Sequence, residues 1–277
     1  MATPTPLVVH HGGCAVHGWL YGDQSASAPL VVMAHGAGMD HRMFDPQLAP
    51  LLGAGYRVLT LDFRGHGSSQ PLGRLPLTID DLAEDVLRLA DHAAAPRFAM
   101  VGQSMGGLVA QRLAARHPHR VAAVIIIGAN CTTETLSRWE RCGLRSSVSW
   151  IRLWPWGDLR RRSARATAIT PETRLYAYEA MSTLTKTDFV EVWKAVAGAV
   201  RPEPEHQSQH PLLLTHGNQD RTGTVAKSMA AWARRDPSAR YDVTPNAGHN
   251  ANQDNPDHFN GLLLPFLKEH YPVGASE

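Results

Sequence analysis

A serine between glycines is the residue whose surroundings most clearly indicate chemistry. The sequence Gly102-Gln103-Ser104-Met105-Gly106 follows the apolar run 97–101 and opens a stretch with helical spacing at 105–116. A G-x-S-x-G pattern at such a junction is a nucleophile elbow, a tight turn that lifts the serine hydroxyl clear of a sheet. Side chains at Gly102 and Gly106 would collide with neighbouring backbone. The sequence therefore predicts Ser104 as a nucleophile for acyl transfer.

A serine hydroxyl needs a base to take its proton. Because the elbow motif predicts the chain order serine, acid, histidine, the base is expected near the end of the chain. His249 lies in a loop between the strand-like stretch 241–244 and a final helical stretch. Its competitors are His258, inside that helical stretch, and His270, at its end. We predict His249 as the base.

The acid should lie on a loop that follows a strand, between the serine and the histidine. Asp220 comes directly after the apolar run 212–215, whereas the loop after 121–127 offers no carboxylate until Glu134. Asp220 is therefore the predicted acid. The loop His35-Gly36-Ala37-Gly38 follows another apolar run, and such a loop can place a backbone N–H beside the serine oxygen. The N–H groups of Ala37 and Met105 are the predicted oxyanion hole.

These loops need a sheet to position them. Short apolar runs recur at 29–34, 57–62, 97–102, 121–127 and 212–215, and they alternate with helical spacing at 78–92, 105–116, 224–234 and 256–269. Runs that are apolar on both faces are typical of parallel strands covered by helices on each side. Near the start, 7–10 and 16–21 flank Gly12-Gly13 like an antiparallel hairpin. The pattern predicts an α/β fold with a doubly wound, mostly parallel sheet.

The segment 131–205 interrupts this alternation. It holds five of the seven Trp and the basic run 160–162, with helical stretches but no clear buried strand. We interpret it as a helical cap inserted into a core formed by 1–130 and 206–277. Trp139, Trp150 and Trp154, together with Phe63 of the core, are the predicted substrate-binding residues. An open alternative is that the tryptophans hold the cap together and that the basic run is a solvated face.

Taken together, these motifs resemble the α/β-hydrolase superfamily, in its serine-nucleophile branch with a cap. The shared pieces are H-G at 35–36, D-x-R-G-H-G-x-S at 62–69, G-x-S-x-G-G at 102–107, G-x-x-D at 217–220 and G-H at 248–249. The resemblance implies Ser104 as nucleophile, Asp220 as acid and His249 as base, with an acyl pocket between core and cap. Serine at 104 departs from the dehalogenases and epoxide hydrolases, which carry aspartate, and the absence of H-G-G-P-G separates the chain from proline iminopeptidases.

The expected function is hydrolysis of a carboxylic ester, lactone or thioester of a small to medium, mainly apolar substrate through an acyl-enzyme. One rival is a carbon–carbon bond hydrolase acting on a ring-fission diketone, which would use the same triad. Another is a ligand receptor or scaffold with little turnover. A screen that includes esters and a diketone distinguishes the carbon–carbon bond hydrolase. Ligand binding without turnover would indicate the receptor or scaffold.

The amino-acid composition limits the classes of partner and cofactor that we expect. Twenty-seven Lys and Arg against 25 Asp and Glu give a net charge of +2, which offers no overall reason to expect nucleic acid or a membrane as partner. Three cysteines with no C-x-x-C spacing predict neither a metal site nor a cofactor. The start of the chain is neither basic nor strongly apolar, so the expected location is cytoplasmic. A monomer or homodimer acting on a small molecule is expected.

Overall fold

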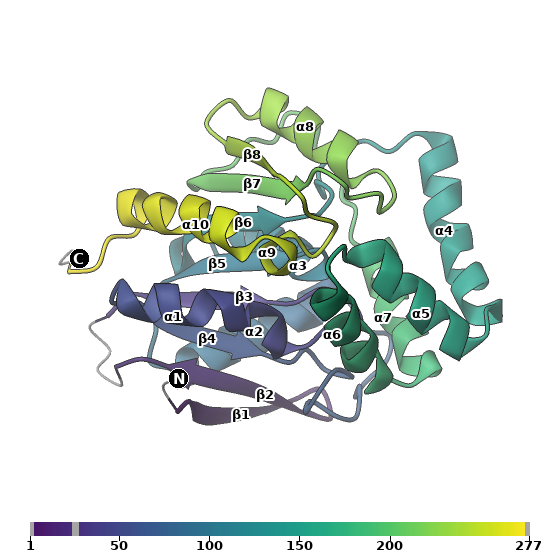
Figure 1. The fold of residues 1–277 in the computed structure, drawn as a ribbon, viewed down its shortest axis with the longest axis horizontal. Coiled ribbons are helices and arrows are strands. Elements are labelled where there is room, and N and C mark those ends of the chain that lie inside the picture. Colours follow the sequence, from purple (N-terminus) through teal and green to yellow (C-terminus); the bar gives the residue numbers. More distant parts are fainter. Residues whose placement is uncertain (1–2, 24–27, 275–277) are drawn as a thin grey trace.

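The main feature of the chain is an eight-stranded sheet, seen in a computed structural model that describes residues 3–23 and 28–274 (Figure 1). The strands are β1 (Thr5–His11), β2 (Cys14–Tyr21), β3 (Leu30–Ala34), β4 (Arg57–Leu61), β5 (Phe98–Gln103), β6 (Val121–Ile127), β7 (Leu212–Gly217) and β8 (Arg240–Thr244). Their order is β1-β2-β4-β3-β5-β6-β7-β8. The hairpin β1–β2 is antiparallel, as predicted, and so is its pairing with β4, while the strands from β4 to β8 pair in parallel. The predicted, mostly parallel sheet is confirmed.

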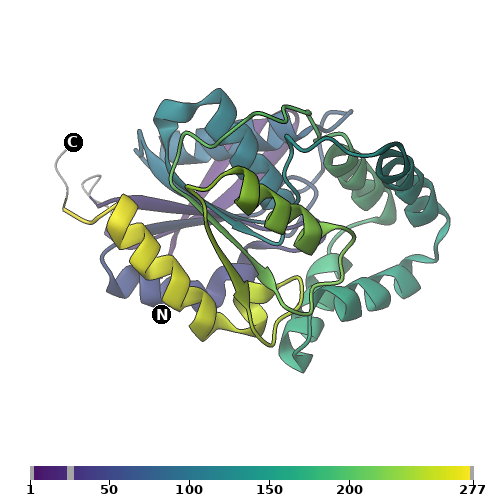
Figure 2. The same ribbon diagram turned by 90° about the horizontal axis from the view of Figure 1, so that it is seen from above.

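Helices cover both faces of this sheet (Figures 1 and 2). The core helices are α1 (Asp45–Gly53), α2 (Ile79–His92), α3 (Met105–Arg116), α8 (Val225–Arg235), α9 (Ala251–Asp254) and α10 (Pro256–His270). One apolar cluster joins the sheet to α2, α3 and α8, and a second joins it to α1 and α10. Every residue of the central strands β3 to β7 is buried between these layers, which explains their continuous apolar runs.

Local signals fix the helix ends. Thr78 caps α2, because its hydroxyl accepts a hydrogen bond from the Asp81 N–H while the Asp81 carboxylate accepts one from the Thr78 N–H. Such a reciprocal capping box stabilises a helix N-terminus. The helices predicted at 78–92, 105–116, 224–234 and 256–269 are all present within a residue or two. Helix α1 was not predicted.

Four further helices lie between β6 and β7 in the chain, all inside the segment 131–205. They are α4 (Arg138–Leu153), α5 (Trp156–Thr167), α6 (Pro171–Ser182) and α7 (Lys186–Ala197). They form the group to one side of the sheet in Figure 1, with α4 along its outer margin. One anchor to the core is Tyr176 on α6, whose hydroxyl donates to the Asp40 carbonyl at 3.0 Å and accepts from the Asp40 N–H at 3.1 Å.

The topology brings the predicted site loops to one end of the sheet. β3 and β5 are neighbours, and the chain leaves β3 toward β4 on one side but continues from β5 toward β6 on the other. Loops at the carboxyl ends of strands around such a switch point line a crevice. The loops after β3, β5, β7 and β8 carry Ala37, Ser104, Asp220 and His249 respectively. Within the described residues, we find no helix with the length and apolar character needed to span a bilayer.

Candidate active site

Ser104 sits on a strained turn between β5 and α3. Its φ is 50° and its ψ is −111°, a backbone conformation that costs about 1–3 kcal/mol for a residue with a side chain. A Cβ on Gly106 would lie 2.0 Å from the Ala34 carbonyl oxygen, and one on Gly102 would lie 2.2 Å from that of Gly106. Both positions therefore require glycine. Ser104 is partly exposed although the residues on either side of it are buried.

His249 and Asp220 form a direct pair. The Nδ1 atom of His249 lies 2.8 Å from Oδ2 of Asp220, and the side chains are only 6% and 0% exposed. Burial alone would raise the pKa of the Asp220 carboxyl, but the hydrogen bond and charge of His249, with the Thr222 N–H, outweigh it and lower that pKa. Asp220 is thus an ionised acceptor at neutral pH, and Nδ1 of His249 carries the shared proton.

Two features hold the His249 loop close to the end of β7 and to the elbow. A Cβ on Gly217 would lie 2.1 Å from the carbonyl oxygens of both Ala247 and Gly248, so only glycine lets this loop pass over the end of β7. The side-chain amide of Gln103 donates from Nε2 to the His249 carbonyl at 3.1 Å. Because Gln103 directly precedes Ser104, this bond ties the base loop to the elbow. The spacing motifs gave no indication of this role for Gln103.

A third anchor for the same loop comes from Asp254. Its carboxylate accepts hydrogen bonds from the N–H groups of Gly248 at 2.9 Å, Ile169 at 3.0 Å and Thr170 at 3.0 Å. Asn250 adds a bond from its N–H to the Thr167 carbonyl at 2.8 Å. The residues beside His249 are therefore bonded to the segment that joins α5 to α6.

Two buried histidines brace the loop after β3. The Gly38 N–H donates to Nε2 of His66 at 3.0 Å, and the Phe63 N–H donates to Nε2 of His35 at 3.0 Å. An acceptor Nε2 requires a neutral ring, with the proton on Nδ1. Burial supports this state, because it lowers the pKa of His66 to about 3 and also lowers that of His35. The segment 62–69 thus holds the predicted oxyanion loop through His66.

Both predicted oxyanion donors belong to segments next to Ser104. A Cβ on Gly36 would be 3.2 Å from Cβ of Ser104, so the loop that carries Ala37 passes beside this serine. Met105 is the first residue of α3, where backbone N–H groups have no partner within the helix. In residues 3–23 and 28–274, no hydrogen bond from either N–H to another group of the protein is found.

Helices α6 and α7 carry an apolar cluster that packs against this loop. Met181, Leu184 and Phe189 are buried there, and Ala37, Trp156 and Trp193 pack against them. Trp193 is held by a hydrogen bond from its Nε1 to the Ser147 hydroxyl at 2.8 Å. The aromatic side chains of this cluster therefore come from α5 and α7. Tryptophan content alone did not distinguish them from the others.

The predicted substrate-binding residues require correction. Trp139 and Trp150 are 86% and 65% exposed on α4 and take no part in the apolar cluster. Trp154 is also exposed, with the Arg162 guanidinium 5.1 Å from its ring centre. Phe63, by contrast, is fully buried. Its side chain is 0% exposed and packs edge-on against the His35 ring, so none of its surface is open to a substrate.

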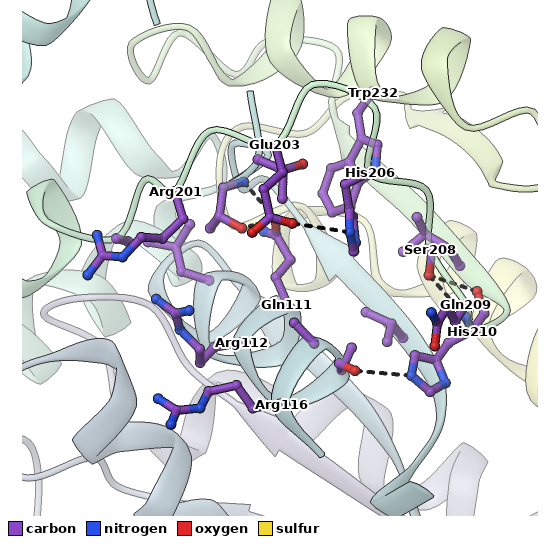
Figure 3. Close-up of a pocket in the computed structure, with 18 of the residues that line it drawn as sticks. Gln111, Arg112, Arg116, Arg201, Glu203, His206, Ser208, Gln209, His210 and Trp232 are labelled. Atoms are coloured by element: carbon purple, nitrogen blue, oxygen red, sulfur yellow. Dashed lines mark hydrogen bonds and ion pairs between the residues drawn. The ribbon is translucent and has the colours of Figure 1, made fainter. Parts of the chain in front are cut away.

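Two other features are not part of the predicted triad. Asp40, His41 and Asp62 hold three potential metal-ligand atoms within 4.8 Å of one another, but Asp62 already accepts from His41 and Ser68, and Asp40 from Arg42. A cavity of about 400 Å³ lies between α3 and the segment 199–212 (Figure 3) and contains neither Ser104, Asp220 nor His249. Two of the three arginines that line it, Arg112 and Arg116, pair with Asp80.

Comparisons with known proteins agree with the fold and these motifs. The profile described as the alpha/beta hydrolase family matches residues 31–260. A non-heme haloperoxidase of Rhodococcus erythropolis is 27% identical over 290 residues, covering 95% of this chain and 99% of the relative. A 3-oxoadipate enol-lactonase of Acinetobacter baylyi is 35% identical over 116 residues, but that match spans only 42% of either protein.

Solved structures extend the likeness over nearly the whole chain. The crystal structure of an enol-lactonase from Burkholderia xenovorans LB400 superimposes with a TM-score of 0.82 at 26% identity, covering 95% of this chain and 100% of the other. The protein is an enzyme of the α/β-hydrolase type, and its chain belongs to the alpha/beta hydrolase family.

Proposed function

We propose that this chain is a serine hydrolase that cleaves a carboxylic ester, lactone or thioester with a small to medium, mainly apolar acyl group. The observation that carries the proposal is the strained, partly exposed Ser104, whose neighbour Gln103 is hydrogen-bonded to the carbonyl of His249, a histidine already paired at 2.8 Å with a buried carboxylate. A serine with only a structural role in a glycine-rich turn would need neither a strained backbone nor a nearby histidine–carboxylate pair. The names of the lactonase relatives agree with this substrate class.

The reaction follows from the protonation states. Because Nδ1 of His249 donates to ionised Asp220, its Nε2 is free to take the Ser104 proton as Oγ attacks the carbonyl carbon. The carbonyl π electrons move to oxygen, and the resulting oxyanion accepts hydrogen bonds from the Ala37 and Met105 N–H groups. His249 then gives its proton to the leaving group as the acyl-enzyme forms. Water attacks the acyl-enzyme by the same steps and releases the acid.

The cap supports an apolar acyl group. The cluster of Met181, Leu184 and Phe189 packs directly on Ala37, so a carbonyl held there would extend its substituent toward apolar side chains. Burying such a chain is favourable by about 0.8 kcal/mol per methylene. A Phe189→Ala variant should therefore weaken the preference for octanoate over butanoate esters, measured as the ratio of kcat/KM values. Leu175→Ala, on an exposed face of α6, is the matched control.

The test is steady-state hydrolysis of p-nitrophenyl esters, a lactone, an acyl thioester and a vinylogous diketone. We expect turnover of at least one of the first three, with Ser104→Ala slower by at least about 10³-fold. Ser149→Ala, an exposed serine on α4, should keep the wild-type rate. Wild-type rates in Ser104→Ala would contradict the assignment, and turnover of the diketone alone would favour carbon–carbon bond hydrolysis.

A further inference from the structure

Helix α4 exposes an unusual amount of apolar surface. None of its 16 residues is buried, and Trp139, Trp150 and Leu153 are among the most exposed large apolar side chains of the described residues. With Cys142 and Ser146 they follow the 3-or-4-residue spacing of one helical face. Leu144, Val148 and Ile151 lie on the partly buried side instead. Exposed apolar patches of this kind mark interaction sites.

A stripe of arginines runs beside the apolar face. Arg138, Arg141, Arg145 and Arg152 are all exposed on the same helix. Residues 138–165 contain eight arginines and two acidic residues, an excess of six positive charges in a chain whose net charge is +2. The positive charge is therefore concentrated on α4 and α5, and the rest of the chain is acidic on balance.

The basic surface continues onto α5. Arg161, Arg162 and Arg165 line an open groove of about 600 Å³. Arg162 also lies over the Trp154 ring at the end of α4, so the groove and the exposed face of α4 are joined by a cation–π contact. Only Arg161 of these three forms a recorded ion pair, with Asp158, among the described residues.

We propose that the exposed face of α4, with the α5 groove, docks onto an anionic phospholipid surface. Tryptophan and leucine on one stripe with arginine on the next is the pattern of helices that lie in the plane of a bilayer interface. There the indole rings sit at the depth of the headgroups, and the guanidinium groups meet lipid phosphates with matching charge and geometry. This role goes beyond the proposed hydrolysis, and a chain inactive toward esters would still show it.

The test uses the full chain and 100 nm vesicles, either of neutral phosphatidylcholine or with phosphatidylglycerol as a third of the lipid. We expect the protein to sediment with the anionic vesicles only, and less so at high salt. Cys142 is the exposed cysteine on this face, while Cys14 and Cys131 are buried. An environment-sensitive fluorophore on Cys142 should therefore shift to the blue as anionic vesicles are added.

Paired variants separate the two stripes. At the usual contribution of a basic residue near an anionic surface, Arg141→Gln with Arg145→Gln should weaken binding about thirty-fold. Trp139→Ser with Trp150→Ser should also weaken binding. The controls are Arg74→Gln with Arg240→Gln and, for apolar loss, Leu75→Ser, all exposed and outside the cap. Circular dichroism and the thermal midpoint verify that each variant is folded.

Three results would overturn the proposal. The first is no binding of the folded wild type to anionic vesicles. The second is equal binding to neutral vesicles, or equal loss in the control variants. The third is a wild-type dimer in analytical ultracentrifugation that Trp139→Ser with Trp150→Ser converts to monomer while vesicles fail to compete, because the face would then be covered by a second copy.

Discussion

A close approach to the backbone of the His249 loop makes Gly217 the most informative position to change. In Gly217→Ala the added methyl carbon would lie 2.1 Å from the carbonyl oxygens of Ala247 and Gly248. That is about 1 Å below any contact that a methyl carbon tolerates. Both obstacles are backbone atoms, so no side-chain rotation relieves the clash. The loop must move, and it carries His249.

The size of the effect follows from that movement. Overpacking of this kind destabilises a protein by about 1–3 kcal/mol. A displacement of about 1 Å at a catalytic group costs about 10²-fold in rate. The hydrogen bond from His249 to Asp220 at 2.8 Å is the contact most directly at risk. We therefore expect kcat on a p-nitrophenyl ester to fall by about 10²-fold while KM changes little.

Gly261→Ala is the matched control. A Cβ on Gly261 would have no atom within 4 Å, and the residue is exposed inside α10. Alanine in a helix interior is better than glycine by about 0.5–1 kcal/mol, so this variant should gain stability in urea unfolding and keep wild-type kcat. If Gly217→Ala retained kcat within twofold at unchanged stability, the loop geometry described above would be wrong.

Two more predictions concern groups around the predicted triad. Asp254→Asn should lower the free energy of unfolding in urea by about 1.5–3 kcal/mol, because the Gly248 N–H loses a charged acceptor, and it should also lower kcat. The control Asp257→Asn, at an exposed position, should change neither quantity. Unchanged stability and kcat in Asp254→Asn would show that this anchor is dispensable. His66 has a folded pKa of about 3, lower than its unfolded value, so the unfolded chain binds the proton more readily and stability is lost as pH falls below about 6.5. The free energy of unfolding should drop by about 1.4 kcal/mol per pH unit from this group, and an equally steep decline in His66→Gln would contradict the neutral-ring assignment.

Much of the fold was predictable because its signals are local. Apolar runs such as 121–127 and the cap at Thr78 specify strand and helix without reference to distant residues. The elbow around Ser104 was equally predictable from the sequence, since only glycine is possible at positions 102 and 106. Helix α1 was not predicted from the sequence because Pro46 and Pro50 lie within it, and proline ordinarily indicates the end of a helix.

The surroundings of the site were much less predictable. Whether a tryptophan packs into the apolar cluster next to the predicted oxyanion loop or faces solvent depends on how helices α4 to α7 pack. Trp139 and Trp193 offer the same local sequence signal, yet Trp139 is exposed and Trp193 packs against that cluster. His66, Gln103 and Asp254 each bond to a partner far along the chain, respectively Gly38, His249 and Ile169. Their roles depend on tertiary contacts that no spacing rule contains. A buried polar residue in a glycine-rich loop, as at His66, is the nearest thing to a sequence signal.

Reaction with a fluorophosphonate, followed by intact-mass and peptide mass spectrometry, most directly tests whether Ser104 is an activated nucleophile. We expect a single adduct on the wild type, located at Ser104, with none on Ser104→Ala and much slower labelling of His249→Ala. An adduct on Ser104→Ala at the wild-type rate would place the nucleophile elsewhere. A folded wild type that takes no label would contradict an active triad.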